Sequence, residues 1–190
     1  MRVRFVVSLP YNMVMMRSSG KEFGEGDLRR VVEWSKMFER EWRKHERRVT
    51  DRISKYSGFD WETEDVVCFA LEDFPVAGIS LPLTIRMGDL QERIKTLTHE
   101  LIHVNLPRNF KNLIRESEKP RTFNHIALYL IYNRIIAEIF PASEPYSEFE
   151  LKGIYGEAIK KSVELEPLWR KSDKNIYDFM KLCLRRKLVP

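Results

Sequence analysis

The segment that most constrains the fold is residues 122–140, TFNHIALYLIYNRIIAEIF, which is apolar around almost its whole circumference when written as a helix. Such a helix has no face suited to water, so we expect it at the centre of a packed core. Pro141 follows the segment and predicts where the helix ends. No stretch of the chain approaches the roughly 20 apolar residues that a membrane span needs.

Strands are predicted mainly in the first half of the chain. β-branched and aromatic residues predict strands over residues 2–9 and 65–71. Residues 79–87, ISLPLTIRM, alternate in polarity and predict a third strand, and Pro82 places it at a sheet edge because proline cannot donate to a ladder. With helices following, the order predicts an α+β fold in one domain over residues 1–190, in which several helices pack on one side of a small mixed sheet.

Four further helices are expected from apolar periodicity and end signals. Their predicted ranges are residues 28–56, 90–105, 147–165 and 167–187. Asp27 is the expected cap of the first, and Asp89 with Glu92 makes a capping box for the second, which should end before Pro107. The polar and basic residues 106–121 should connect the second to the apolar helix, with space for one short helix.

The N-terminus and the two cysteines indicate a reduced compartment. The first apolar run is interrupted at Ser8, Pro10 and Asn12, which predicts a strand and a loop and not a secretory signal. Cys68 and Cys183 lie in apolar surroundings and in no CxxC pair, so we expect buried thiols and neither a disulfide framework nor a thiolate zinc site. The expected location is therefore the cytoplasm, with no membrane attachment.

The sequence His99-Glu100-Leu101-Ile102-His103 carries the chemistry. Residues four apart lie on one face of a helix, so the two imidazoles can bind one zinc ion, while Glu100 beside them can reach a metal-bound water without ligating the metal. The expected buried stripe of this helix, Leu90, Ile94, Leu97 and Leu101, leaves both histidines off the apolar face. The spacing therefore predicts a zinc site with Glu100 as the base.

Zinc needs a third protein ligand, and His125 is our choice. It lies near the start of the apolar helix, which an antiparallel course after a short connection would bring back towards the metal. Glu138 is the rival, because a carboxylate in so apolar a helix needs either a metal or a base such as Arg134. The two candidates differ by roughly 220° around the helix, so they cannot both face one ion.

The segment LTHELIHVNL resembles the active-site helix of zincin-type metallopeptidases, and ISLPLTIRM resembles the edge strand that holds their extended substrates. The resemblance covers about residues 79–140 and is specific at residues 99–103. It implies a zincin-like fold, in which an edge strand packs against the active-site helix with its HExxH motif, together with one zinc ion and the hydrolysis of peptide bonds in a peptide or protein substrate. Leu106 and Asn109 stand where metzincins have glycine and a third histidine, so that branch is excluded, and no other subfamily is assigned.

A donor for the oxyanion of the transition state is also expected. Tyr132 is the candidate, on the side of its helix that carries His125, although packing is the more ordinary role for a tyrosine there. Tyr129, Tyr155 and Arg134 are further options.

The alternative function is a non-catalytic metal-containing module that binds nucleic acid or regulates a partner. Its basis is the net charge of +5, the pI of about 9.2 and the basic run in the predicted helix 28–56. Such a run is more often a solvated helix face. His45 within it falls on the apolar stripe, which favours a packed core histidine.

Overall fold

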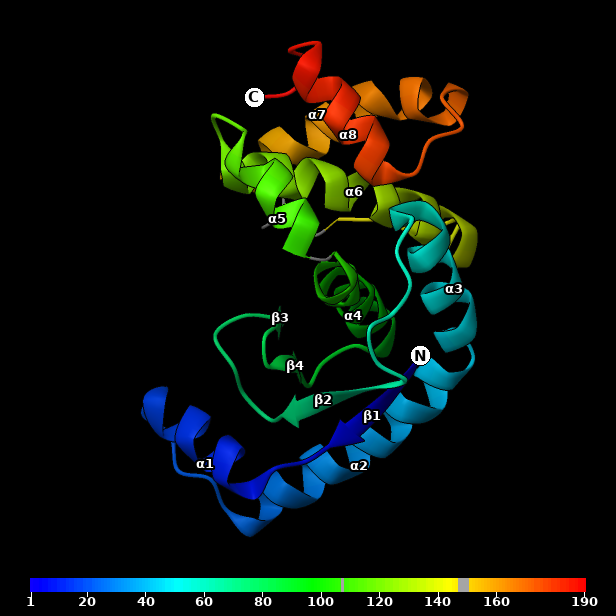
Figure 1. Cartoon of the computed structure of the whole chain (residues 1–190). Coiled ribbons are helices and arrows are strands. Elements are labelled where there is room, and N and C mark those ends of the chain that lie inside the picture. The colour runs from blue at the N-terminus through cyan, green and yellow to red at the C-terminus, as the bar shows by residue number, and fades with distance from the viewer. Residues whose placement is uncertain (107, 147–150) are drawn as a thin grey trace. The chain divides into compact units, whose positions relative to one another are not determined.

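The computed structural model describes residues 1–106, 108–146 and 151–190, and these form two compact units (Figure 1). The first unit contains Met1–Thr50 and Trp61–Val104, and the second contains Asp51–Asp60 and Asn105–Pro190. The first holds a mixed sheet with its helices, and the second is helical. The α+β class is confirmed, whereas a single zincin-like domain over the whole chain stays a prediction.

The sheet of the first unit has the strand order β1-β2-β4-β3. Strand β1 (Arg2–Val6) pairs in parallel with β2 (Asp65–Leu71), and β2 pairs in parallel with β4 (Leu83–Arg86). Strand β3 (Gly78–Ser80) lies at the edge and is antiparallel to β4. The sheet is therefore small and mixed, as predicted, and β2 has the predicted bounds.

The prediction of one continuous strand over residues 79–87 is wrong, because this segment forms a hairpin of two strands, β3 and β4. Ser80 pairs with Leu83, so Leu81 and Pro82 form a two-residue turn between β3 and β4, and the Leu81 side chain is 80% exposed. Paired residues share a face of the sheet, which separates Ile79 from Leu83. Apolar and polar residues continue to alternate through this two-residue turn, so the sequence pattern alone did not reveal the turn. The edge position itself is confirmed for β3.

Helix α1 (Leu9–Ser18) occupies a segment that the sequence analysis assigned to a strand end and a loop. The backbone N–H of Tyr11 donates to Oγ of Ser8 over 3.4 Å, and Pro10 stands in the first turn, where its missing N–H has no cost. Asn12 is buried: its Nδ2 donates to the Ala70 carbonyl and its Oδ1 accepts from the Glu72 N–H. Thus Ser8 and Pro10, which interrupt the apolar run, start helix α1, and Asn12 connects this helix to β2.

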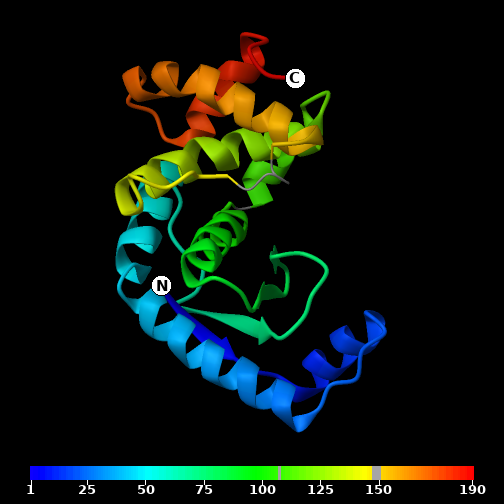
Figure 2. The same cartoon turned by 180° about the vertical axis from the view of Figure 1, so that it is seen from behind.

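The predicted helix over residues 28–56 is two helices, α2 (Glu25–Arg43) and α3 (Glu46–Ser57). Helix α2 runs along β1 and β2 (Figures 1 and 2). Its cap is Gly24, and Asp27 lies inside the helix, where Oδ2 accepts the Gly24 N–H over 2.8 Å. The break allows Glu46 to accept the Val3 N–H over 2.7 Å, a contact that no local pattern specifies.

The second unit is built around α6 (Pro120–Ile139), which packs against α5 (Arg108–Arg115), α7 (Gly153–Lys171) and α8 (Ile176–Arg185). Buried side chains lie all along α6, so its central place in a core is confirmed. Helix α5 is the one short helix that the sequence allowed in the connecting segment 106–121.

The predicted boundary between the last two helices is wrong. The start predicted at residue 147 falls in 147–150, outside the described residues. Helix α7 continues through Pro167, and buried Leu165 and Trp169 on either side offset the backbone hydrogen bond that proline removes. Helix α8 begins instead after Asn175, whose Oδ1 accepts the Asp178 N–H over 2.9 Å.

Both thiols are free and buried, as expected. Burial raises the pKa of Cys68 well above its usual range and that of Cys183 to about 11. Over the described residues, no helix has both the length and the apolar character needed to cross a bilayer.

Candidate metal centre

Helix α4 (Leu90–Asn105) carries the predicted motif, and its bounds are those predicted. The Glu92 N–H donates to Oδ1 of Asp89 over 3.0 Å, which is the expected cap. Pro107, the predicted stop signal, lies outside the described residues.

The two faces of α4 differ as the spacing predicts. Ile94, Leu97 and Leu101 are buried, and only Leu90 of the predicted stripe is half-buried. The residues of the motif, His99, Glu100 and His103, are half-buried on the remaining surface. They are therefore neither in the core nor fully in solvent.

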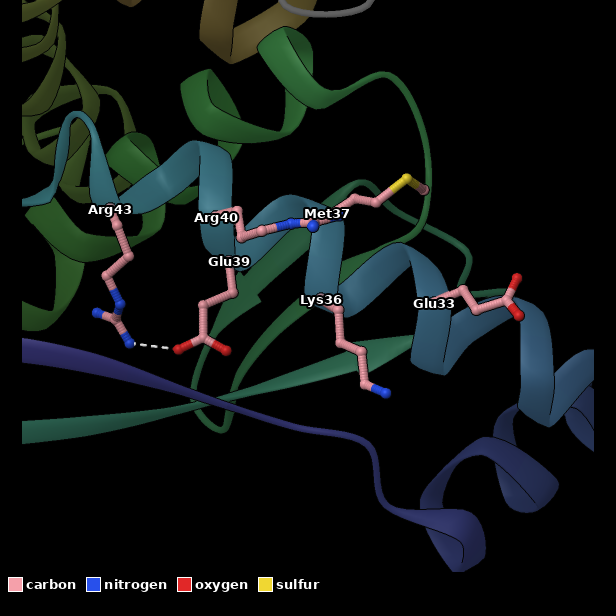
Figure 3. Close-up of a pocket in the computed structure, with 6 residues that line it drawn as sticks. All are labelled: Glu33, Lys36, Met37, Glu39, Arg40 and Arg43. Atoms are coloured by element: carbon pink, nitrogen blue, oxygen red, sulfur yellow. Dashed lines mark hydrogen bonds and ion pairs between the residues drawn. The ribbon is translucent and has the colours of Figure 1, made fainter.

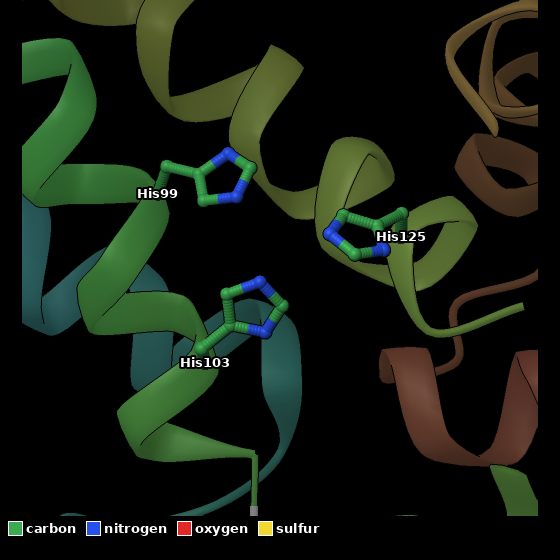
Figure 4. A group of neighbouring side chains, drawn as sticks. All are labelled: His99, His103 and His125. Atoms are coloured by element: carbon green, nitrogen blue, oxygen red, sulfur yellow. The ribbon is translucent and has the colours of Figure 1, made fainter. Parts of the chain in front are cut away.

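The two imidazoles of α4 lie next to each other, with ring centroids 5.1 Å apart and planes at 66° (Figure 4). This is the arrangement expected one helical turn apart on the same face. The rings differ in tilt, so their nitrogens can point towards a common position beside the helix.

His125 lies near the start of α6, and its own neighbours orient it. Its Nδ1 lies 2.8 Å from the Arg121 carbonyl oxygen. A carbonyl only accepts, so Nδ1 carries the proton and Nε2 carries the lone pair that a metal requires. The ring of Tyr155 stands edge-on to the imidazole, with centroids 4.7 Å apart and planes at 89°. Backbone support of this kind is usual behind metal-bound histidines.

His99, His103 and His125 lie close enough to bind one metal ion. One possible ligand nitrogen from each lies within 4.8 Å of the others, and all three side chains are half-buried (Figure 4). In a tetrahedral zinc site with nitrogens about 2.1 Å from the metal, ligand atoms stand about 3.4 Å apart. Small side-chain rotations would therefore bring the three nitrogens to zinc-binding separations.

Glu100 lies against the edge strand. A Cβ atom placed on Gly78 of β3 would stand 2.9 Å from Cγ2 of Thr96, 3.0 Å from the Thr84 carbonyl oxygen and 3.3 Å from Cγ of Glu100. Only a residue without a side chain allows this approach. The predicted packing of an edge strand against the helix with the HExxH motif is thus present. Burial raises the pKa of the Cys68 thiol, and the negative charge of Glu100 raises it further.

Glu138, the rival ligand, is bound elsewhere. Its carboxylate forms an ion pair with Nε of Arg52 over 2.8 Å and accepts the Tyr56 hydroxyl over 2.6 Å. The expectation that Arg134 would pair with it is wrong. Instead, Nε of Arg134 lies 3.4 Å from Oε1 of Glu166. The guanidinium carbon of Arg134 stacks over the Trp169 ring, 3.7 Å from its centroid. Arg52 comes from α3, which sequence spacing could not place beside α6.

Tyr132 is buried in the second unit, where its hydroxyl donates to the Pro145 carbonyl over 2.8 Å. This is the packing role that sequence reasoning considered the more ordinary one. Its role as the oxyanion donor stays a prediction.

Sequence reasoning missed two residues near the motif. Gly78 directly precedes the alternating run, and a glycine at that position was the available signal of a close backbone approach. Arg93 stands seven positions before Glu100, which is nearly two helical turns, so both residues lie on the same side of α4. This spacing was the available signal.

Two cations of the basic run on α2 and α3 are paired with acids. Arg43 pairs with Glu39 and Glu46, and Lys44 pairs with Glu41. His45 lies between the helices, 3.7 Å from Glu41, and burial lowers its pKa, so it is the partly packed histidine expected from the stripe.

A surface hollow lies on α2. Figure 3 shows its lining, which consists of Glu33, Lys36, Met37, Glu39, Arg40 and Arg43. All six residues belong to one helix, the lining mixes both charge signs, and it contains no histidine or cysteine. We assign it no chemical role.

Comparisons with family models, with curated proteins and with solved structures gave no match.

Proposed function

We propose that the protein is a zinc-dependent peptidase whose metal is held by His99, His103 and His125. The observation that carries the proposal is the gathering of these three nitrogens within 4.8 Å, with Glu100 adjacent in sequence to His99. Three neutral imidazoles are a usual ligand set for catalytic zinc, in which the fourth position is left to water.

The residues divide the chemistry between them. Bound zinc would supply a Lewis acid that lowers the pKa of its water to about 7. Glu100 would accept a proton as the water oxygen attacks the peptide carbonyl, and would return a proton to the amine as the C–N bond breaks. His125, held through Nδ1 by the Arg121 carbonyl, would keep Nε2 directed at the ion.

Strand β3 would hold the substrate. Among the described strands it has a neighbour on one side only, and Gly78 brings its backbone against Glu100. An extended peptide can add to such an edge through main-chain hydrogen bonds, which bind peptides with little regard to sequence. The proposal therefore places the substrate backbone beside the base.

The alternative, a non-catalytic module that binds nucleic acid, has less support. It depended on the basic run, and two cations of that run, Arg43 and Lys44, are paired with glutamates of the same helices. Such pairs lower the positive potential that phosphates would encounter.

The deciding experiment is Glu100→Gln, which preserves size and removes the base. We expect it to retain zinc, measured by elemental analysis of the purified protein, and to hydrolyse an unfolded protein substrate at least about 100-fold more slowly than wild type. Glu62→Gln, at an exposed position of the same unit, is the matched control and should retain full activity. Hydrolysis that survives in zinc-loaded Glu100→Gln would reject Glu100 as the base.

A further inference from the structure

Arg93 is a partly buried cation without an ionic partner in the described part of the chain. No described carboxylate lies within ion-pair distance, and its Nε is buried with no hydrogen-bond acceptor. Among the described residues, its one side-chain hydrogen bond is a long contact of 3.4 Å from Nη1 to Oγ1 of Thr96. An unpaired guanidinium in such a place is unfavourable, and proteins retain few of them without a use.

The surroundings of Arg93 favour an anion from outside. Burial lowers its pKa first, and the positive charge of Arg86 lowers it further, while Asp89 and Glu92 raise it by smaller amounts. Arg86 is itself held in place, with Nη1 donating to the Phe74 carbonyl over 2.9 Å. Two cations thus lie near each other, and an incoming carboxylate would relieve both the repulsion and the cost of burial.

A glycine makes space for the Arg93 side chain. A Cβ on Gly88 would stand 2.6 Å from Nε and 2.8 Å from Nη2 of Arg93, so the guanidinium lies directly on the Gly88 backbone. Gly88 is exposed and Arg93 is half-buried, which leaves this place accessible from solvent. The guanidinium is therefore held in position and can still be reached.

The position of Arg93 relates it to the proposed peptide path. It precedes Glu100 by seven residues on α4, nearly two full turns, so both lie on one side of the helix about 10 Å apart along its axis. An extended peptide covers that length in about three residues. The same side of α4 meets β3 at Gly78, beside Thr96 and Glu100.

We propose that Arg93, assisted by Arg86, forms a subsite for a carboxylate of the substrate about three residues from the bond that is cut. This inference rests on the proposed peptidase function and adds the class of substrate: peptides with an acidic side chain, or with a free C-terminus, at that distance. Arginine suits the role because its planar fork can donate two parallel hydrogen bonds to one carboxylate.

The test measures binding and not hydrolysis. The protein is zinc-loaded Glu100→Gln, and the probes are ten-residue uncharged peptides in which a single glutamate, or glutamine in the matched peptide, is moved along the sequence. Each peptide is made with a free and with an amidated C-terminus. We expect at least one glutamate position, or the free C-terminus, to bind about 10- to 100-fold more tightly than its neutral match. The two arms separate a side-chain carboxylate from a terminal one.

Three variants in the same background assign the effect. Arg93→Gln should abolish the preference, Arg93→Lys should retain only part of it, and Gly88→Ala should weaken it by displacing the guanidinium. Arg29→Gln, an exposed arginine of α2, makes the same charge change and should leave the preference intact. Equal binding of charged and neutral peptides, or a preference that persists in Arg93→Gln, overturns the inference.

Failure of this inference is distinguishable from failure of the peptidase proposal. If wild type cuts peptides and Glu100→Gln shows no carboxylate preference, only the subsite is rejected. If wild type cuts nothing and the preference depends on Arg93, the subsite is supported and the hydrolytic function is rejected.

Discussion

At the scale of the residue, a single backbone hydrogen bond decides what His125 can do. Because the Arg121 carbonyl lies 2.8 Å from Nδ1, the neutral ring presents Nε2 as its metal-binding atom. The edge-on ring of Tyr155 restrains the imidazole further. A ligand held in this way loses little conformational freedom when it binds an ion.

Replacing His125 by alanine should therefore weaken zinc binding by about 100-fold or more, since removal of a ligand costs more than removal of a supporting residue. The measurement is competition with a chromogenic chelator at constant pH. His45→Ala is the matched control and should bind zinc as wild type does, because His45 is outside the histidine group. Unchanged affinity in His125→Ala would remove this residue from the ligand set.

At the scale of the element, contact between β3 and α4 depends on Gly78. A Cβ there would approach Cγ2 of Thr96 to 2.9 Å and the Thr84 carbonyl oxygen to 3.0 Å. One of these neighbours is backbone and cannot rotate away. Strand and helix are thus in contact because one position lacks a side chain.

Gly78→Ala should lower the free energy of unfolding by about 1–3 kcal/mol through overpacking, as measured by urea denaturation. Thr96→Ser removes the methyl group nearest the new Cβ, so the double variant should recover part of the loss. Gly26→Ala is the control, since its Cβ would meet only Arg30 at 3.8 Å. If Gly78→Ala is as stable as wild type, the close packing of β3 on α4 is incorrect.

Elements with local signals were predicted well, and those that depend on distant residues were not. Helix α4 matched its prediction because Asp89 caps it locally and its apolar residues recur at the helical period. The break between α2 and α3 was missed because it goes with a distant contact. Glu46, at the start of α3, accepts a hydrogen bond from the Val3 N–H, 43 positions away in the chain. Helix α1 was missed because Ser8 and Pro10 were interpreted as interruptions of a strand and not as a helix start.

At the scale of the whole molecule, a metal that binds only the folded chain should stabilise it. At a free zinc concentration about 100 times the dissociation constant, the gain is about 2.7 kcal/mol, which for a chain of this length corresponds to a rise in Tm of about 5–10 °C. Thermal melts of chelator-treated and zinc-loaded protein test this. Glu100→Gln should show the full rise, because it retains every proposed ligand.

The control for that experiment is the double variant His99→Ala/His103→Ala. Both residues lie on the half-buried side of α4, so their loss should remove the response to zinc without emptying the core. An equal rise of Tm in the double variant would show that zinc stabilises the chain from another site.

The sequence by itself determined the pairing of His99 with His103, the place of Glu100 beside them and the buried course of α6, because each follows from the 3.6-residue period of a helix. Tertiary structure alone decided that Glu138 pairs with Arg52, that residues 78–86 form a hairpin and that Gly78 lies against Glu100. These features join residues far apart in the chain, and their energies come from packing and pairing that no local pattern encodes.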